Sequence, residues 1–155
     1  MVTEILRLAL LLLHGLAGAA WFGSIFYSLF VLYPRASAFF DKLAERERFF
    51  LALSHGARWH MIAALSLVGL SGVGLVALAS EPPTSGKLIL WGAKAVLLIV
   101  SAVLFWRVSW YWWPARLFAL EPELPALHRR FRVGAGCMMV LVSSNIILGI
   151  VSRYC

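Results

Sequence analysis

The chain of 155 residues is 62% hydrophobic and only 14% charged, and its mean hydropathy is +0.86. A soluble domain of this length cannot bury so much apolar surface, so the composition excludes a water-soluble globular protein and indicates a protein of the lipid bilayer. The formal net charge of +7 requires no nucleic-acid partner, because a basic rim facing anionic lipid accounts for it.

Four apolar stretches are long enough to cross the hydrocarbon core of a bilayer, which takes about 20 helical residues. They cover residues 8–34, 61–80, 88–106 and 133–152. With their flanking turns, the predicted helices run approximately over residues 5–34, 52–80, 87–113 and 129–153. None of the stretches alternates as a barrel strand does. We therefore expect an all-α fold, in which residues 1–155 form one integral membrane domain, a four-helix up-down bundle.

The first stretch begins like a cleavable leader, with a short charged start, an apolar run and the small residues Gly18, Ala19 and Ala20. The apolar run continues past them to Pro34, which is too long for a leader. We therefore expect this segment to be retained as the first transmembrane helix.

The third helix carries an aromatic run from Trp106 to Trp113 near its end. Such a run is typical of an anchor at a membrane interface, and it would also suit the edge of a pocket for a flat ligand. We expect Pro114 to end the helix.

Basic residues are concentrated in the first and third connections between the helices. They are Arg35, Lys42, Arg46, Arg48 and Arg58, followed by Arg107, Arg116, Arg129, Arg130 and Arg132. The second connection carries Lys87 alone. The positive-inside tendency then places the first and third connections in the cytoplasm. Both termini are expected on the outer, periplasmic side of a bacterial-type inner membrane, which the chain crosses several times.

Each predicted helix carries a polar residue at nearly the same depth, roughly 10 Å below the outer edge of the hydrocarbon. These residues are His14, Ser71, Lys94 and Asn145. An ionisable side chain in lipid is expensive, so a functional role is expected for His14 and Lys94. Asn145 and Ser71 also suit hydrogen bonds that join helices.

Helical spacing places Trp21 on the stripe of His14 and Trp91 on the stripe of Lys94. The candidate cofactor-binding residues are accordingly His14, Lys94, Trp21, Trp91 and Asn145. The sequence identifies no catalytic residue.

The residue types of this layer favour haem b over copper. A neutral imidazole is a good axial ligand to haem iron, and lysine suits a sixth-ligand position or a haem propionate better than it suits Cu(I). Copper would take His14 together with sulfur ligands nearer the cytoplasmic side. The candidate metal ligands are His14, His60, Met61, Cys137 and Met138. Histidines beside arginines at the headgroup boundary, such as His60 and His128, equally suit a solvated interface.

Residues 13–26, LHGLAGAAWFGSIF, followed by YPRA at 33–36, resemble the first helix of the CopD family of copper-resistance membrane proteins. They also resemble the related HemJ-type protoporphyrinogen oxidases. In both families a histidine precedes a tryptophan-containing element by about two helical turns. The resemblance to HemJ-type proteins implies a haem b held by His14 and Lys94. The CopD resemblance extends to residues 58–72 and 145–149 and implies copper transport across the inner membrane.

Two features depart from the HemJ-type pattern, namely the spacing of Trp91 and Lys94 and the lack of a proline in the second helix. Three classes of function therefore stay open. The first is a haem-binding redox protein that exchanges electrons with a quinone or a porphyrin. The second is a copper transporter, and the third is a non-catalytic accessory subunit that docks with a larger membrane complex.

Overall fold

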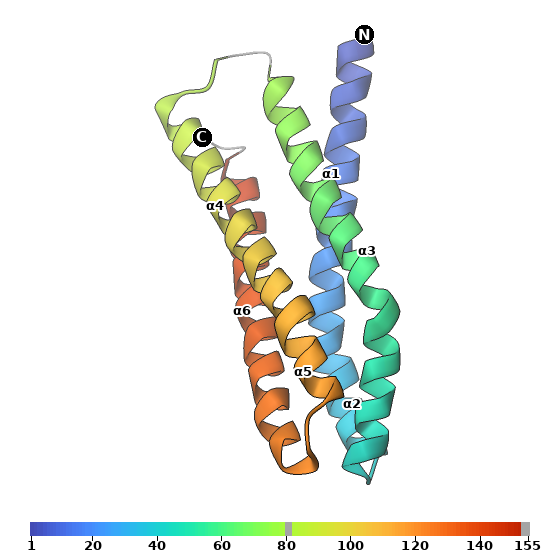
Figure 1. Ribbon diagram of the computed structural model, residues 1–155. Coiled ribbons are helices and arrows are strands. Elements are labelled where there is room, and N and C mark those ends of the chain that lie inside the picture. The colour runs from blue at the N-terminus through green and yellow to red at the C-terminus, as the bar shows by residue number, and fades with distance from the viewer. Residues whose placement is uncertain (80–81, 153–155) are drawn as a thin grey trace.

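The computed structural model describes residues 1–79 and 82–152, and in these ranges the protein is helical apart from short connections (Figure 1). Four helical segments in these ranges are long and apolar enough to cross a membrane. They are Val2–Phe39, Leu43–Ala77, Ser85–Leu117 and Glu121–Val151. The predicted all-α fold with four such helices is confirmed. The predicted helix ends at residues 80 and 153 lie outside the described residues.

The first and third segments are each built from three consecutive elements. The first consists of α1 (Val2–Tyr27), the π-helical stretch η1 (Ser28–Leu32) and α2 (Tyr33–Phe39). The third consists of α4 (Ser85–Arg107), the π-helical stretch η2 (Val108–Trp112) and α5 (Trp113–Leu117). The second segment is α3 (Leu43–Ala77) alone, and the fourth is a short 3-10 turn, η3 (Glu121–Glu123), followed by α6 (Leu124–Val151).

Both π-helical stretches precede a proline. Pro34 and Pro114 lie in the first turns of α2 and α5, and the helix continues through each of them. A proline inside an α-helix lacks an N–H group and clashes with the carbonyl four residues earlier. The wider π turn moves that carbonyl aside, and the N–H before each proline donates five residues back, from Tyr33 to Ser28 and from Trp113 to Val108. The third segment therefore does not end at Pro114, as the sequence predicted, but at Leu117.

The helices pack side by side in two pairs, α1 along α3 and α4 along α6, and α1 also packs along α6 (Figure 1). The connection from α2 to α3 and the connection from α5 to α6 lie at the same end of the molecule, opposite the start of α1 (Figure 1). We refer to this end as the basic end, because the arginines of the first and third connections lie there.

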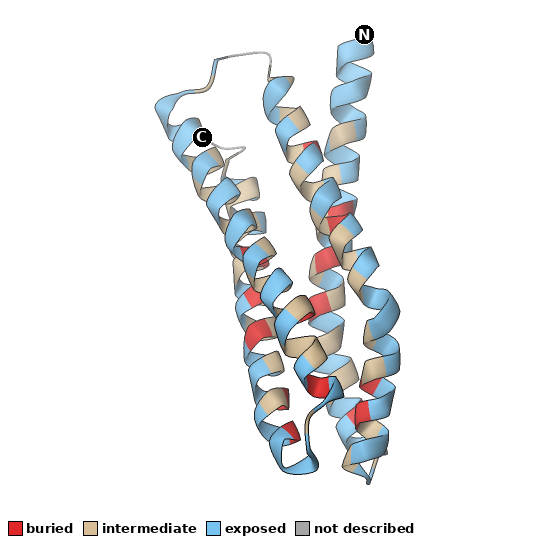
Figure 2. Cartoon of the chain, viewed as in Figure 1, coloured by how far each residue is buried: buried red, intermediate tan, exposed pale blue. Residues whose placement is uncertain are grey.

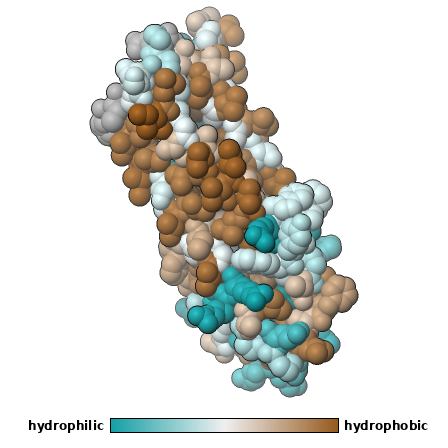
Figure 3. All heavy atoms as spheres, turned by 60° about the vertical axis from the view of Figure 1, so that its left-hand side comes forward, coloured by the Kyte–Doolittle hydropathy of each residue, from teal (hydrophilic) through white to brown (hydrophobic). Residues whose placement is uncertain are grey.

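Large apolar side chains are exposed on the outer faces of the helices, and few residues are buried (Figure 2). Leu70 is 72% exposed, Ile89 is 72% exposed and Val140 is 65% exposed. On the face shown in Figure 3, hydrophobic atoms cover the middle of the molecule and hydrophilic atoms gather toward the basic end. Apolar surface of this extent is suited to contact with lipid rather than with water.

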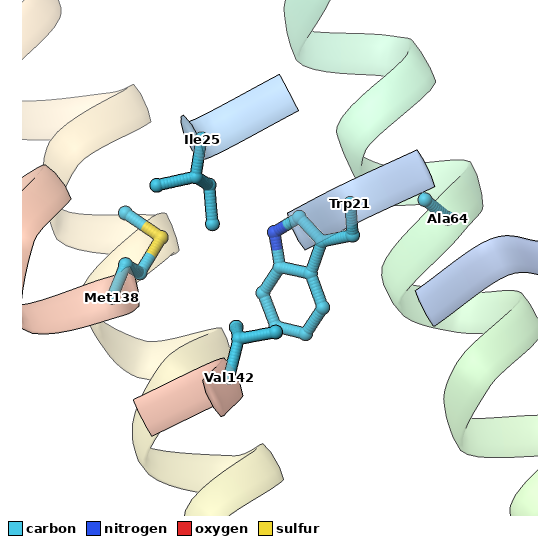
Figure 4. Packing of buried hydrophobic residues seen from close by; sticks show 5 residues of the cluster. All are labelled: Trp21, Ile25, Ala64, Met138 and Val142. Carbon is cyan, nitrogen blue, oxygen red and sulfur yellow. The ribbon is translucent and has the colours of Figure 1, made fainter. Parts of the chain in front are cut away.

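The buried core lies near the middle of the bundle and joins α1, α3 and α6 (Figure 4). Trp21, only 4% exposed, extends its indole ring from α1 toward Val142 of α6, with Ala64 of α3 on its other side (Figure 4). Ile25 and Met138 complete the cluster. The core fixes the rotation of α1, and it thereby decides which of its residues face the neighbouring helices.

Candidate functional site

His14 of α1 is held against α3 by its Nδ1 atom. This atom lies 3.0 Å from the carbonyl oxygen of Val68 and 3.0 Å from Oγ of Ser71. A carbonyl oxygen can only accept, so Nδ1 carries a proton and donates it. The Ser71 hydroxyl donates to the carbonyl of Leu67 and offers its lone pair to His14. In the neutral ring, the lone pair is consequently on Nε2, the tautomer that metal-ligating histidines commonly adopt.

Lys94 of α4 lies at the same level of the bundle. It is close enough to His14 for the two side chains to interact electrostatically. On the opposite side, Asn145 donates from Nδ2 to the backbone carbonyl of Lys94 over 3.0 Å. A Cβ added to Gly149 would lie 3.5 Å from the Lys94 Nζ atom, so this glycine leaves α6 narrow where the lysine passes.

The structure thus brings the four residues of the predicted polar layer together across all four helices. His14 and Ser71 connect α1 with α3, and Lys94 and Asn145 connect α4 with α6. His14 precedes Pro34 by the same number of residues as Lys94 precedes Pro114. The two ionisable residues therefore occupy equivalent positions in two segments of the same design, each with an α-helix, a π-helical stretch and a proline in that order.

The two candidate tryptophans differ in their surroundings. Trp21 belongs to the buried core and packs against α3 and α6. Trp91 is half-buried on α4, one turn from Lys94. Trp91 is therefore the candidate tryptophan beside the polar layer, because it is close to Lys94 on the same helix.

The candidate metal ligands near the basic end are not gathered at one point. Met138 is buried in the core and Met61 packs against it. Cys137 is exposed and lines an apolar groove of about 850 Å³ between α4 and α6. His60 is exposed, and its Nδ1 atom lies 3.0 Å from the carbonyl of Gly56 on its own helix. Within residues 1–79 and 82–152, no three His, Cys, Asp or Glu side chains form a group that could hold a metal ion.

A buried ion cluster that the sequence did not predict lies at the basic end. Arg116 of α5 donates to Glu47 of α3, from Nε to Oε1 over 2.7 Å and from Nη2 to Oε2 over 2.9 Å. Nε2 of His128, from α6, lies 2.6 Å from the same Oε2. All three residues are buried. The cluster therefore ties three helices together where their connections meet.

Aromatic rings enclose this cluster. The Arg116 guanidinium lies 4.7 Å from the ring centroid of Phe131 and 5.8 Å from that of Phe50. Nearby, Arg58 donates to the carbonyl of Ser109 over 2.7 Å and lies 4.9 Å from the rings of Trp110 and Trp113. The aromatic run of the third segment therefore stacks on an arginine of α3 rather than serving only as an interface anchor.

The sequence offered one signal for the cluster. Glu47 lies in the charged run Glu45-Arg46-Glu47-Arg48, which is typical of a solvated helix surface. It also lies one turn before Phe50 on the face of α3 that is buried. A carboxylate in register with a buried aromatic residue indicates an inward-facing group, although its partners are distant in sequence.

Comparison of the chain with protein-family models, with curated proteins and with solved structures finds no match.

Proposed function

We propose that the protein is a multi-pass membrane protein that binds haem b at the layer of His14 and Lys94 and acts in membrane redox or haem handling. The observation that carries the proposal is the hydrogen bond from Nδ1 of His14 to the carbonyl of Val68. This bond leaves the lone pair of Nε2 available to a metal and fixes the ring against α3, as the hydrogen bonds that orient haem and metal ligands do.

The donor set of the layer fits haem. His14 supplies one nitrogen ligand, and Lys94 supplies either a second nitrogen or a positive charge for a propionate. Gly18 lies one turn from His14 on the same stripe, and a Cβ added there meets no atom within 4 Å. At this position of the stripe, therefore, no side chain stands between His14 and a ligand.

Bound haem would supply one-electron redox chemistry at this layer. The residues of the chain orient this site. Val68 and Ser71 orient the ring of His14, and Asn145 holds the Lys94 backbone. A quinone or a porphyrin within the bilayer is the electron partner that suits a site at this depth.

The copper alternative receives less support from the geometry. It takes the same histidine, but its sulfur ligands are divided between the core, where Met138 lies, and the lipid-facing groove lined by Cys137. Cu(I) prefers soft sulfur ligands gathered around one point. An accessory subunit of a larger complex would use the layer only to pack the helices.

We further propose that the helices form an up-down bundle in a bacterial-type inner membrane, with both termini on the outer side. The arginines gathered at one end favour a cytoplasmic position for that end. Single cysteines at Thr84→Cys and Phe118→Cys, in a chain in which Cys137 and Cys155 are replaced by alanine, test the orientation. A membrane-impermeant maleimide should label intact cells at position 84 and leave position 118 unlabelled, and the reverse pattern would overturn the assignment.

The test of the haem proposal is the reduced-minus-oxidised visible spectrum of the protein purified in mild detergent. Sharp α and β bands with a Soret shift are expected, together with their loss in His14→Ala. The matched control is His60→Ala, which changes an exposed histidine of α3 and should retain the bands. A featureless spectrum of the unmodified protein, or loss of the bands in the control instead, would contradict the proposal.

A further inference from the structure

Three buried side-chain hydrogen-bond donors have no partner among the described residues. One is Nε1 of Trp113, at the start of α5, and the other two are the hydroxyl of Tyr33 and Nε of Arg46. Buried donors in proteins are nearly always paired, because a buried donor without a partner has lost its hydrogen bond to water and gained none in return. Two such donors on neighbouring elements, Tyr33 and Arg46, make the start of α3 a candidate site for a ligand that accepts hydrogen bonds.

The two donors belong to neighbouring elements. Tyr33 begins α2 directly after the π-helical stretch, and its ring stacks on Phe50 of α3 with 4.6 Å between the centroids. Arg46 lies in the first turn of α3, next to Glu47. The ring of Tyr33 thus lies against α3, and Arg46 and Glu47 at the start of that helix are near enough to act on the hydroxyl electrostatically.

The charges around the Tyr33 hydroxyl are mainly positive. Three arginines, Arg46, Arg116 and Arg132, and one carboxylate, Glu47, are near enough to act on it electrostatically. Glu47 already accepts from Arg116 and contacts His128. In the described part of the chain, neither Arg46 nor Arg132 takes part in an ion pair. Like charges held this close favour binding of an anion.

We propose that Tyr33, Arg46 and Arg132 form a binding site for a phosphate group. A phosphate accepts several hydrogen bonds at once and suits guanidinium groups in particular. Arg132 is exposed, so its side chain can turn outward and admit the anion to the two buried donors. Glu47 does not repel the ligand strongly, because the Arg116 guanidinium offsets its charge.

The phosphate can come from an anionic lipid headgroup or from free inorganic phosphate. The site lies at the basic end, where headgroups of the adjoining leaflet would be within reach. The chemistry of recognition is the same for both sources, so the experiment has one arm for each. Neither arm depends on haem, and the proposal is tested separately from the proposed function.

The experiment measures the unfolding temperature of the full chain in a neutral detergent. Dihexanoyl phosphatidic acid is titrated in one arm and sodium phosphate in the other, against dihexanoylglycerol and sodium chloride. At least one phosphate-bearing probe is expected to raise the unfolding temperature. Stabilisation by the lipid alone identifies a headgroup site, and stabilisation by both probes identifies a site for free phosphate as well.

The variants Tyr33→Phe and Arg46→Gln should lower the affinity for the stabilising probe by about tenfold or more, because each removes a hydrogen bond to a charged group. The matched controls Tyr111→Phe and Arg48→Gln change exposed residues and should bind as the unmodified protein does. Tyr33→Phe removes one oxygen only, so the stacking of its ring on Phe50 and the fold are retained and binding can be measured. If neither probe stabilises the protein, or if the Tyr33 and Tyr111 variants behave alike, the proposal is wrong.

Discussion

Arg116 donates two parallel hydrogen bonds to Glu47, and the two side chains are only 3% and 8% exposed. The residues are 69 positions apart in the chain, so the pair joins the end of the third segment to the start of α3. Removal of the carboxylate would leave the guanidinium buried without its counter-charge. We expect Glu47→Ala to lower the free energy of unfolding by about 3–5 kcal/mol.

Chemical denaturation in detergent measures this loss, and Glu45→Ala is the matched control. Glu45 forms an exposed ion pair with Lys42 over 3.6 Å, and such pairs contribute less than about 1 kcal/mol. Equal losses for the two variants would mean that the buried cluster does not hold the basic end together.

Two glycines of α6 should respond in opposite ways to an added methyl group. A Cβ on Gly134 would lie 2.8 Å from a ring carbon of Trp112, whereas a Cβ on Gly136 meets no atom within 4 Å. Gly134→Ala should destabilise the protein by about 1–3 kcal/mol through overpacking. Gly136→Ala should stabilise it by up to about 1 kcal/mol, because alanine has the higher helix propensity.

The midpoint of thermal unfolding distinguishes the two variants in a single experiment. A stabilising Gly134→Ala would show that the indole of Trp112 moves aside at little cost, and that α6 does not depend on close approach to η2.

Trp21 is the largest residue of the buried core. Its side chain is 4% exposed, while Trp59 of α3 is 68% exposed. Trp21→Ala should lower the free energy of unfolding by about 3–5 kcal/mol, because it leaves a cavity among α1, α3 and α6. Trp59→Ala should change it far less. Similar losses in denaturant titrations of the two variants would place the main packing of the bundle elsewhere.

Ser71 supports the ring of His14 without being a ligand itself. Ser71→Ala removes one of the two acceptors for Nδ1 and leaves the carbonyl of Val68 in place. We expect haem affinity to fall by about tenfold, the effect usual when a group that orients a metal ligand is removed. Haem titration followed at the Soret band measures it. Ser101→Ala, which changes a buried serine bonded to its own helix, should leave the affinity unaltered.

The four spans and the common depth of the polar layer could be predicted from the sequence, because both depend only on hydrophobic length and on the rise per residue of a helix. The pairing of His14 with Ser71 and of Asn145 with the Lys94 backbone required the rotation of each helix about its axis. That rotation is set by the core around Trp21, whose partners lie on two other helices. The chain alone carries no direct record of such contacts.

The basic end could not be predicted for a different reason. Helix starts at Leu43 and Leu124, well before the predicted positions 52 and 129, lie in charged sequence that resembles an interface loop. Glu47 and His128 lie in these added turns, and both meet Arg116 inside the bundle. Such a pairing is a tertiary effect, and a window on local composition assigns the same residues to solvated surface.

The π-helical stretches also allow the orientation of residues at the two ends of the protein to change independently. Each stretch adds a residue to its helical turn, which rotates everything beyond it by about 100° relative to an unbroken α-helix. The direction in which Tyr33 points around the helix axis is therefore set separately from that of His14. The same holds for Arg116 and Lys94. Closing a π turn by deleting one residue from Ser28–Leu32 would turn the basic end of its helix while leaving the histidine layer in register.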